Sequence, residues 1–174
     1  MNMLESLKKA NSKKKVDEIV DYIGSNPARF KELVKYFLGS EYRITQRAAW
    51  PLRYCVERHP ELIKPHLKSL VDNLRKPGVT DAVKRNSFRL MQFIEIPKSL
   101  RGRVHEICSN YFNNPKEAVA IRVFAMTVMY NISLHHPELK SELAMMIEDQ
   151  MKFGSAGLRA RGRKILKDIE SNGD

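Results

Sequence analysis

The chain has 174 residues, of which 43% are hydrophobic and 29% are charged, proportions typical of a folded globular protein rather than of a disordered segment. Its 31 Lys and Arg residues exceed its 20 Asp and Glu residues, which gives a formal net charge of +11. This charge favours an anionic partner, whether nucleic acid, an acidic protein surface or an anionic lipid surface, and does not decide among the three.

Two classes of protein are excluded by simple patterns. The longest apolar run, Val123 to Leu134, is shorter than the roughly 18 residues that a membrane span requires, and the first residues lack the apolar segment of a signal peptide. The two cysteines, Cys55 and Cys108, lie far apart and show no metal-binding or redox spacing. We therefore expect a cytoplasmic protein without a membrane span, with both thiols reduced and in the core.

Residues 1–15 come first in the chain and hold a cluster of five lysines: Lys8, Lys9, Lys13, Lys14 and Lys15. We interpret this segment as a basic N-terminal arm. From Val16 on, apolar residues recur every three or four positions, which indicates helices over 16–23 and 27–38. The same pattern continues over about 45–59, 60–75, 81–95, 97–113, 117–135, 137–153 and 155–170.

Short turns separate these helices, and no segment shows the alternation typical of a strand. Pro27, Pro60, Pro97 and Pro137 fall where helices start, because the missing N–H of proline has no helical partner at that position. The sequence predicts one helical domain over residues 16–170, followed by a tail over 171–174.

The helices recur as pairs. Arg47, Arg85, Arg122 and Arg159 hold equivalent positions in alternate helices, at spacings of 38, 37 and 37 residues. A two-helix period of this length is typical of a solenoid, in which each pair buries its apolar faces only by stacking on its neighbours. We predict an all-α superhelix of about four helix pairs with an N-terminal capping helix.

The repeat unit resembles that of HEAT-repeat proteins, whose second helix opens with an apolar residue, an arginine and an alanine three positions later. The best match is Ile121-Arg122-Val123-Phe124-Ala125, whereas Trp50 and Phe88 stand where the family has its small residue. Residues 16–170 are also similar to a small family of HEAT-like proteins, through QRAAW at 46–50, HPELIKPHL at 59–67, RVFAM at 122–126, IEDQ at 147–150 and SAGLRARGRKIL at 155–166.

Members of that small family are sometimes named adenylosuccinate lyase. The chain is far shorter than that enzyme and lacks its Ser-rich signature loop, so we expect no lyase activity. The resemblance instead implies that alternate helices line a concave face, where solenoids usually bind their partners. The candidate binding surface consists of the basic residues of those helices and one tryptophan: Arg43, Arg47, Trp50, Arg53, Arg85, Arg89, Arg122, Arg159, Arg161, Arg163 and Lys164.

Two of these features have a structural alternative. The four equivalent arginines pair, in many HEAT arrays, with an acidic or amide group in an adjacent turn. For Trp50 we favour core packing, although Pro51 should kink its helix and could turn the ring into the groove as a base-stacking platform. HEAT-like alkylpurine DNA glycosylases also require a carboxylate beside such aromatic residues, and none lies within one helical turn of Trp50.

Residues that could support catalysis or metal binding are scarce. His105-Glu106-Ile107-Cys108-Ser109 begins like the zinc motif HExxH, but serine replaces the second histidine. Gly154-Ser155-Ala156-Gly157 could hold a phosphate before a basic helix, although Ser155 as the N-cap of that helix is the simpler interpretation. The sequence also contains no nucleophile elbow. We expect no enzyme activity, no cofactor and no metal.

The sequence therefore favours a noncatalytic binding or scaffold module that presents a basic concave surface to an acidic protein partner. The alternative is sequence-nonspecific binding of nucleic acid through phosphate contacts. A salt-dependent mobility shift with DNA and RNA separates the two hypotheses. The oligomeric state is left open by the sequence.

Overall fold

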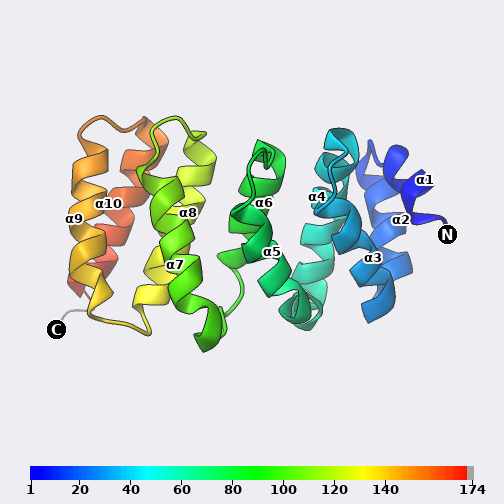
Figure 1. Ribbon diagram of the computed structural model, residues 1–174, viewed down its shortest axis with the longest axis horizontal. Helices are drawn as coiled ribbons and strands as arrows, with labels where there is room; N and C mark the ends of the chain where they lie inside the picture. The colour runs from blue at the N-terminus through cyan, green and yellow to red at the C-terminus, as the bar shows by residue number, and fades with distance from the viewer. Residues whose placement is uncertain (172–174) are drawn as a thin grey trace. The chain divides into compact units, whose positions relative to one another are not determined.

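The computed structural model describes residues 1–171, and over this range it contains ten α-helices, one 3₁₀ helix and no β-strand (Figure 1). The prediction of an all-α solenoid built of helix pairs is confirmed. The chain forms two compact units, Met1–Leu90 and a second that begins at Met91, and each is described by itself.

The first unit is built around one long helix, α4, which packs against α1, α2 and α3. Ala48, Leu52 and Cys55 place small and apolar groups on its buried side at helical spacing. The elements of this unit are α1 (Met3–Lys8), α2 (Lys13–Ile23), α3 (Pro27–Phe37), α4 (Tyr42–Arg58), η1 (Pro60–His66), α5 (Leu67–Leu74) and α6 (Asp81–Met91).

The N-terminal segment differs from its prediction as a basic arm. Residues 3–8 form α1, whose Met3 and Leu7 are buried, and the lysine cluster reaches into the first turns of α2. Two apolar residues four positions apart provide one helical turn with a buried side, a signal too short to stand out among the lysines. The lysine side chains are exposed, but Met3, Leu7 and Ala10 are buried, so this segment belongs to the folded part of the chain.

The segment over 60–75 is not one α-helix, as the sequence pattern predicts, but a 3₁₀ helix followed by α5. Pro60 and Pro65 both lie in the 3₁₀ part, and a proline inside an α-helix removes a hydrogen bond and collides with the preceding turn. The helix expected over 81–95 likewise ends at Met91. Of the expected tail over 171–174, Ser171 closes the last helix, and 172–174 lie outside the described residues.

The second unit contains the last four helices. They are α7 (Lys98–Asn113), α8 (Val119–Ser133), α9 (Leu139–Met151) and α10 (Ala156–Ser171). Helix α8 packs against α7, α9 and α10, and α10 also packs against α9 (Figure 1). The solvent side of α8 therefore adjoins α10, which places the candidate residues of these two helices on neighbouring elements.

Candidate binding surface

Three of the four equivalent arginines close the carboxyl ends of helices. Arg122 of α8 donates from Nε to the carbonyl oxygen of Phe112, near the end of α7, at 2.9 Å, and from Nη2 to the side-chain oxygen of Gln150, near the end of α9. Carbonyl groups in the last turn of a helix lack a helical partner and carry partial negative charge, which a guanidinium satisfies. Arg122 thus ties α8 to both α7 and α9.

The burial of Arg122 removes it from the candidate surface. Its exposed fraction is 8%, and desolvation lowers the pKa of its guanidinium. Arg159 of α10 similarly donates to the carbonyl oxygen of Gly154, in the turn after α9, at 2.6 Å. Arg47 of α4 donates to the carbonyl oxygen of Lys8 at the end of α1. These side chains hold helix ends in place, although Arg159 is still exposed and Arg47 is half-buried.

Arg85 of α6 is the exception among the equivalent arginines. Its side chain is exposed and makes no hydrogen bond or ion pair with any residue of the described range 1–171. Arg89, one turn later on α6, is half-buried. These two residues remain available on the surface of the first unit.

Trp50 lies on the surface of α4, so the interpretation of this ring as part of the core is wrong. Its exposed fraction is 39%, while its neighbours Ala49 and Pro51 are buried. Of the two candidate arginines nearby, Arg53 forms an ion pair with Glu57 at 2.6 Å, and Arg43 is exposed. Other residues of α4 form its buried face, and Trp50 lies outside that face.

The cations of α10 lie on two sides of the helix. Arg161 donates to the Thr127 hydroxyl of α8 at 3.2 Å, and Lys164 lies one turn later on the same side. Arg163 comes two residues after Arg161 and projects from the opposite side of α10, and Lys167 follows Arg163 one turn later. The predicted group Arg159, Arg161, Arg163 and Lys164 is therefore divided between two sides.

One basic surface in the second unit combines α8 and α10, and we call it the α8–α10 surface. From α8 it takes the half-exposed side chains of Val123, Thr127 and Tyr130, and from α10 it takes the half-exposed Arg161 and the exposed Lys164. The only charged residue of α8 is the buried Arg122, so the α8 part of the surface is uncharged. Val123, Thr127 and Tyr130 are not among the candidate residues predicted from the sequence; their spacing of four and three residues is the signal that places them on one side of α8.

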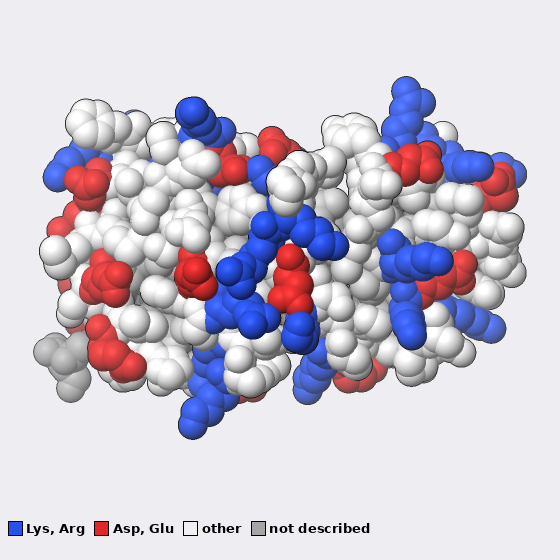
Figure 2. Space-filling view, viewed as in Figure 1, with Lys and Arg blue, Asp and Glu red and all other residues white. Residues whose placement is uncertain are grey.

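Charge in the second unit is separated between helices. Figure 2 shows acidic side chains gathered over α9, which carries Glu142, Glu148 and Asp149, all exposed. Helix α10, packed directly against α9, carries the cations of the α8–α10 surface. The net charge of the protein is therefore not spread evenly, and in this unit α7 and α10 are the basic helices and α9 the acidic one.

The motifs considered for catalysis have structural roles or no partners. Ser155 accepts a hydrogen bond from the Leu158 N–H at 3.3 Å, as expected for the N-cap of α10. Cys108, in the motif that resembles HExxH, is fully buried, and burial raises the pKa of its thiol. Over the described part of the chain, no three His, Cys, Asp or Glu side chains are grouped so that they could hold a metal ion. Within the same residues, no helix combines the length and the apolar character that crossing a bilayer demands.

Stacked helix pairs with arginines that close helix ends define a helical-repeat protein. The family model of the HEAT repeat domain matches residues 3–169, and the chain belongs to this family. The match includes α1, in agreement with the folded N-terminal segment. No curated protein and no solved structure matches the chain.

Proposed function

We propose that the protein is a noncatalytic binding module and that the α8–α10 surface binds an acidic segment of a protein partner. The observation that carries the proposal is the pair of cations on α10, Arg161 and Lys164, beside the uncharged side of α8. Complementary charge steers an acidic partner to such a surface, and apolar contacts supply the affinity at its centre.

The surface suits a protein segment better than a nucleic-acid backbone. Arg161 already donates to Thr127, which leaves Lys164 as the free cation of the pair. Strong binding of nucleic acid uses roughly six or more phosphate contacts, and the acidic α9 next to α10 repels an extended polyanion. A short acidic segment with a few apolar side chains needs fewer cations and uses Val123 and Tyr130.

Charge reversal on α10 tests the proposal. The Arg161→Glu/Lys164→Glu variant should bind a labelled peptide of alternating glutamate and leucine about tenfold more weakly than the wild type, measured by fluorescence anisotropy at low salt. The matched control is Arg163→Glu/Lys98→Glu, which removes two exposed cations of the same unit and changes the net charge equally. An equal loss of binding in both variants would show that net charge, not this surface, attracts the peptide.

A nucleic-acid partner is the second candidate because Trp50 is exposed beside Arg43 and Arg53. Trp50 is the only tryptophan of the chain, so its fluorescence reports on this surface alone. Stacking of a base on the ring should quench the emission when single-stranded oligonucleotides are added, and salt should reverse the effect. No quenching at low salt would remove this candidate.

A further inference from the structure

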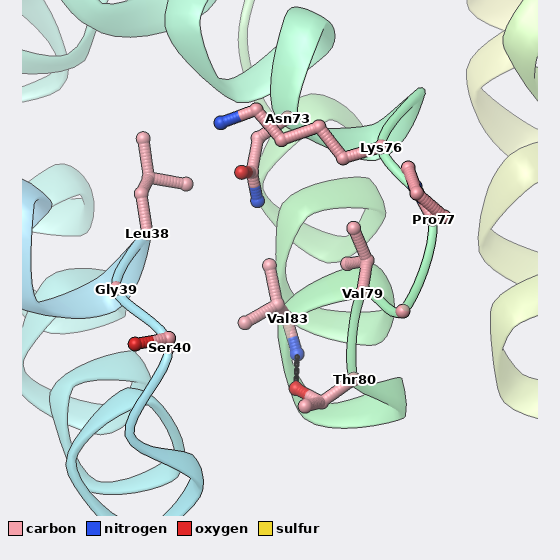
Figure 3. Close-up of a pocket in the computed structure, with 10 residues that line it drawn as sticks. Leu38, Gly39, Ser40, Asn73, Lys76, Pro77, Val79, Thr80 and Val83 are labelled. Atoms are coloured by element: carbon pink, nitrogen blue, oxygen red, sulfur yellow. Dashed lines mark hydrogen bonds between the residues drawn. The ribbon is translucent and has the colours of Figure 1, made fainter.

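The first unit contains a cleft that shares no residue with the α8–α10 surface. It has a volume of about 270 Å³ and lies where the turn after α3 meets the turn between α5 and α6 (Figure 3). Leu38, Gly39 and Ser40 form one wall, and Asn73, Lys76 to Thr80 and Val83 form the other. The lining is thus part apolar and part polar, as in sites that orient a small ligand.

Asn73 is the feature that marks the cleft as a site. Its exposed fraction is only 8%, and no hydrogen bond joins its side-chain amide to any described residue. Figure 3 shows this amide pointing into the space between Leu38 and Val83. Among the described residues, the enclosed side-chain atom without a hydrogen-bond partner is Ser87 Oγ and not the Asn73 amide, so water in the cleft reaches this amide. A polar ligand that displaces the water can take over its hydrogen bonds.

The other polar groups of the cleft define the charge of that ligand. Lys76 supplies the only charged side chain of the lining, is exposed, and forms no ion pair within residues 1–171. Its side chain extends across the cleft beside Asn73 (Figure 3). Thr80 accepts the Val83 N–H at 3.4 Å, which leaves its hydroxyl proton free to donate, and Ser40 adds a second hydroxyl.

We propose that this cleft binds a ligand with a single carboxylate next to a short apolar group. One ammonium balances one negative charge, and the carboxylate oxygens accept hydrogen bonds from Lys76 and from the Asn73 amide. Leu38, Val79 and Val83 contact the apolar group. A phosphate, with nearly two charges, calls for more cations than the cleft supplies. The carboxylate belongs either to the C-terminus of a peptide or to a small organic acid.

The test is an NMR titration of the full ¹⁵N-labelled chain. Butyrate serves as the small acid and N-acetylvaline as the peptide end, each paired with its neutral amide. Both acids should shift the backbone amide signals of Gly39, Ser40 and Gly78 and the side-chain amide of Asn73, and the tighter of the two identifies the source of the carboxylate. Equal shifts from the neutral amides, tighter binding of inorganic phosphate, or no shift at this cleft would overturn the proposal.

Two variants locate the contacts. Lys76→Met removes the charge at an exposed position and should weaken acid binding about fivefold, whereas Lys64→Met, exposed on η1 outside the cleft, should leave it unchanged. Asn73→Leu fills the cleft and should abolish binding if the variant folds. Unaltered affinity of Lys76→Met contradicts the proposal whether or not Asn73→Leu folds.

Discussion

Gly162 of α10 lies so close to Ile147 of α9 that a Cβ atom at position 162 would stand 2.9 Å from the Ile147 Cγ2. The Sδ of Met151 would be still closer, at 2.7 Å. Gly162 occupies the same repeat position as Ala125, three residues after the equivalent arginine. The family's small residue therefore serves close helix packing in the second unit, whereas Phe88 is buried and Trp50 exposed at the corresponding positions of the first.

Replacing Gly162 by leucine should destabilise the protein by about 1–3 kcal/mol, because the added side chain forces α9 and α10 apart. Urea unfolding followed by circular dichroism measures the change. Gly157→Leu, on the exposed first turn of the same helix, is the control: its Cβ would stand 3.9 Å from Val119 Cγ1, an ordinary contact. That control should change the free energy of unfolding by less than about 1 kcal/mol, since glycine is already the poorer helix former. Equal effects at both positions would contradict the close packing.

Arg122→Met should lower the free energy of unfolding by about 2–4 kcal/mol, because the Phe112 carbonyl and the Gln150 side chain both lose a charged donor in a buried setting. Arg85→Met changes the equivalent position of another repeat, where the side chain is exposed and unpaired within residues 1–171. This control should alter stability by less than about 0.5 kcal/mol. Thermal unfolding of the two variants side by side gives the comparison, and similar midpoints would show that Arg122 does not hold the helix ends.

Both thiols should be inert in the folded protein. Burial raises the pKa of Cys55 to about 12 and also raises that of Cys108, so almost no thiolate exists at pH 8. Ellman's reagent should react with neither cysteine in the native state and with both after denaturation. Rapid reaction of a thiol under native conditions would mean that the helices around it open far more often than the packing indicates.

Stability should fall as the pH drops below about 6.5, because burial lowers the pKa of His66 and His105 in the folded state. As the pH falls, the unfolded chain binds a proton at each histidine at a higher pH than the folded chain does. The contribution of the two histidines to stability is therefore complete above pH 6.5 and is lost as the pH falls through their lowered pKa values. Lys31 also lowers the pKa of His66, whereas Glu142 partly opposes the shift at His105.

Unfolding at pH 7.5 and at pH 5.5 provides the measurement. The His66→Gln/His105→Gln variant should lose less stability between these values than the wild type. His135→Gln alters an exposed histidine and should behave as the wild type does. Identical pH dependence in all three proteins would rule out both buried histidines as the cause.

The repeat could be predicted from the sequence because its signal is long: each helix pair has one equivalent arginine, and apolar residues recur at helical spacing along the chain. Helix α1 could not be predicted, because its buried side consists of Met3 and Leu7 alone. The 3₁₀ segment was predicted as part of an α-helix, because its apolar residues keep helical spacing although it contains two prolines. Whether an arginine faces solvent or a neighbouring helix depends on where the neighbouring helices end, and the apolar pattern does not locate those ends. Arg122 is an example, because its partners lie at the ends of α7 and α9. The cleft at Asn73 could not be predicted, because it forms where two turns far apart in the chain meet.

Affinity capture from cell lysate tests the proposed binding function most directly, with the wild type, Arg161→Glu/Lys164→Glu and Arg163→Glu/Lys98→Glu as baits and nuclease present throughout. We expect the wild type and the control to retain the same partner, this partner to carry an acidic segment, and only the Arg161→Glu/Lys164→Glu variant to lose it. Retention of the partner by that variant, or its disappearance on nuclease treatment, would contradict a protein-binding role for the α8–α10 surface.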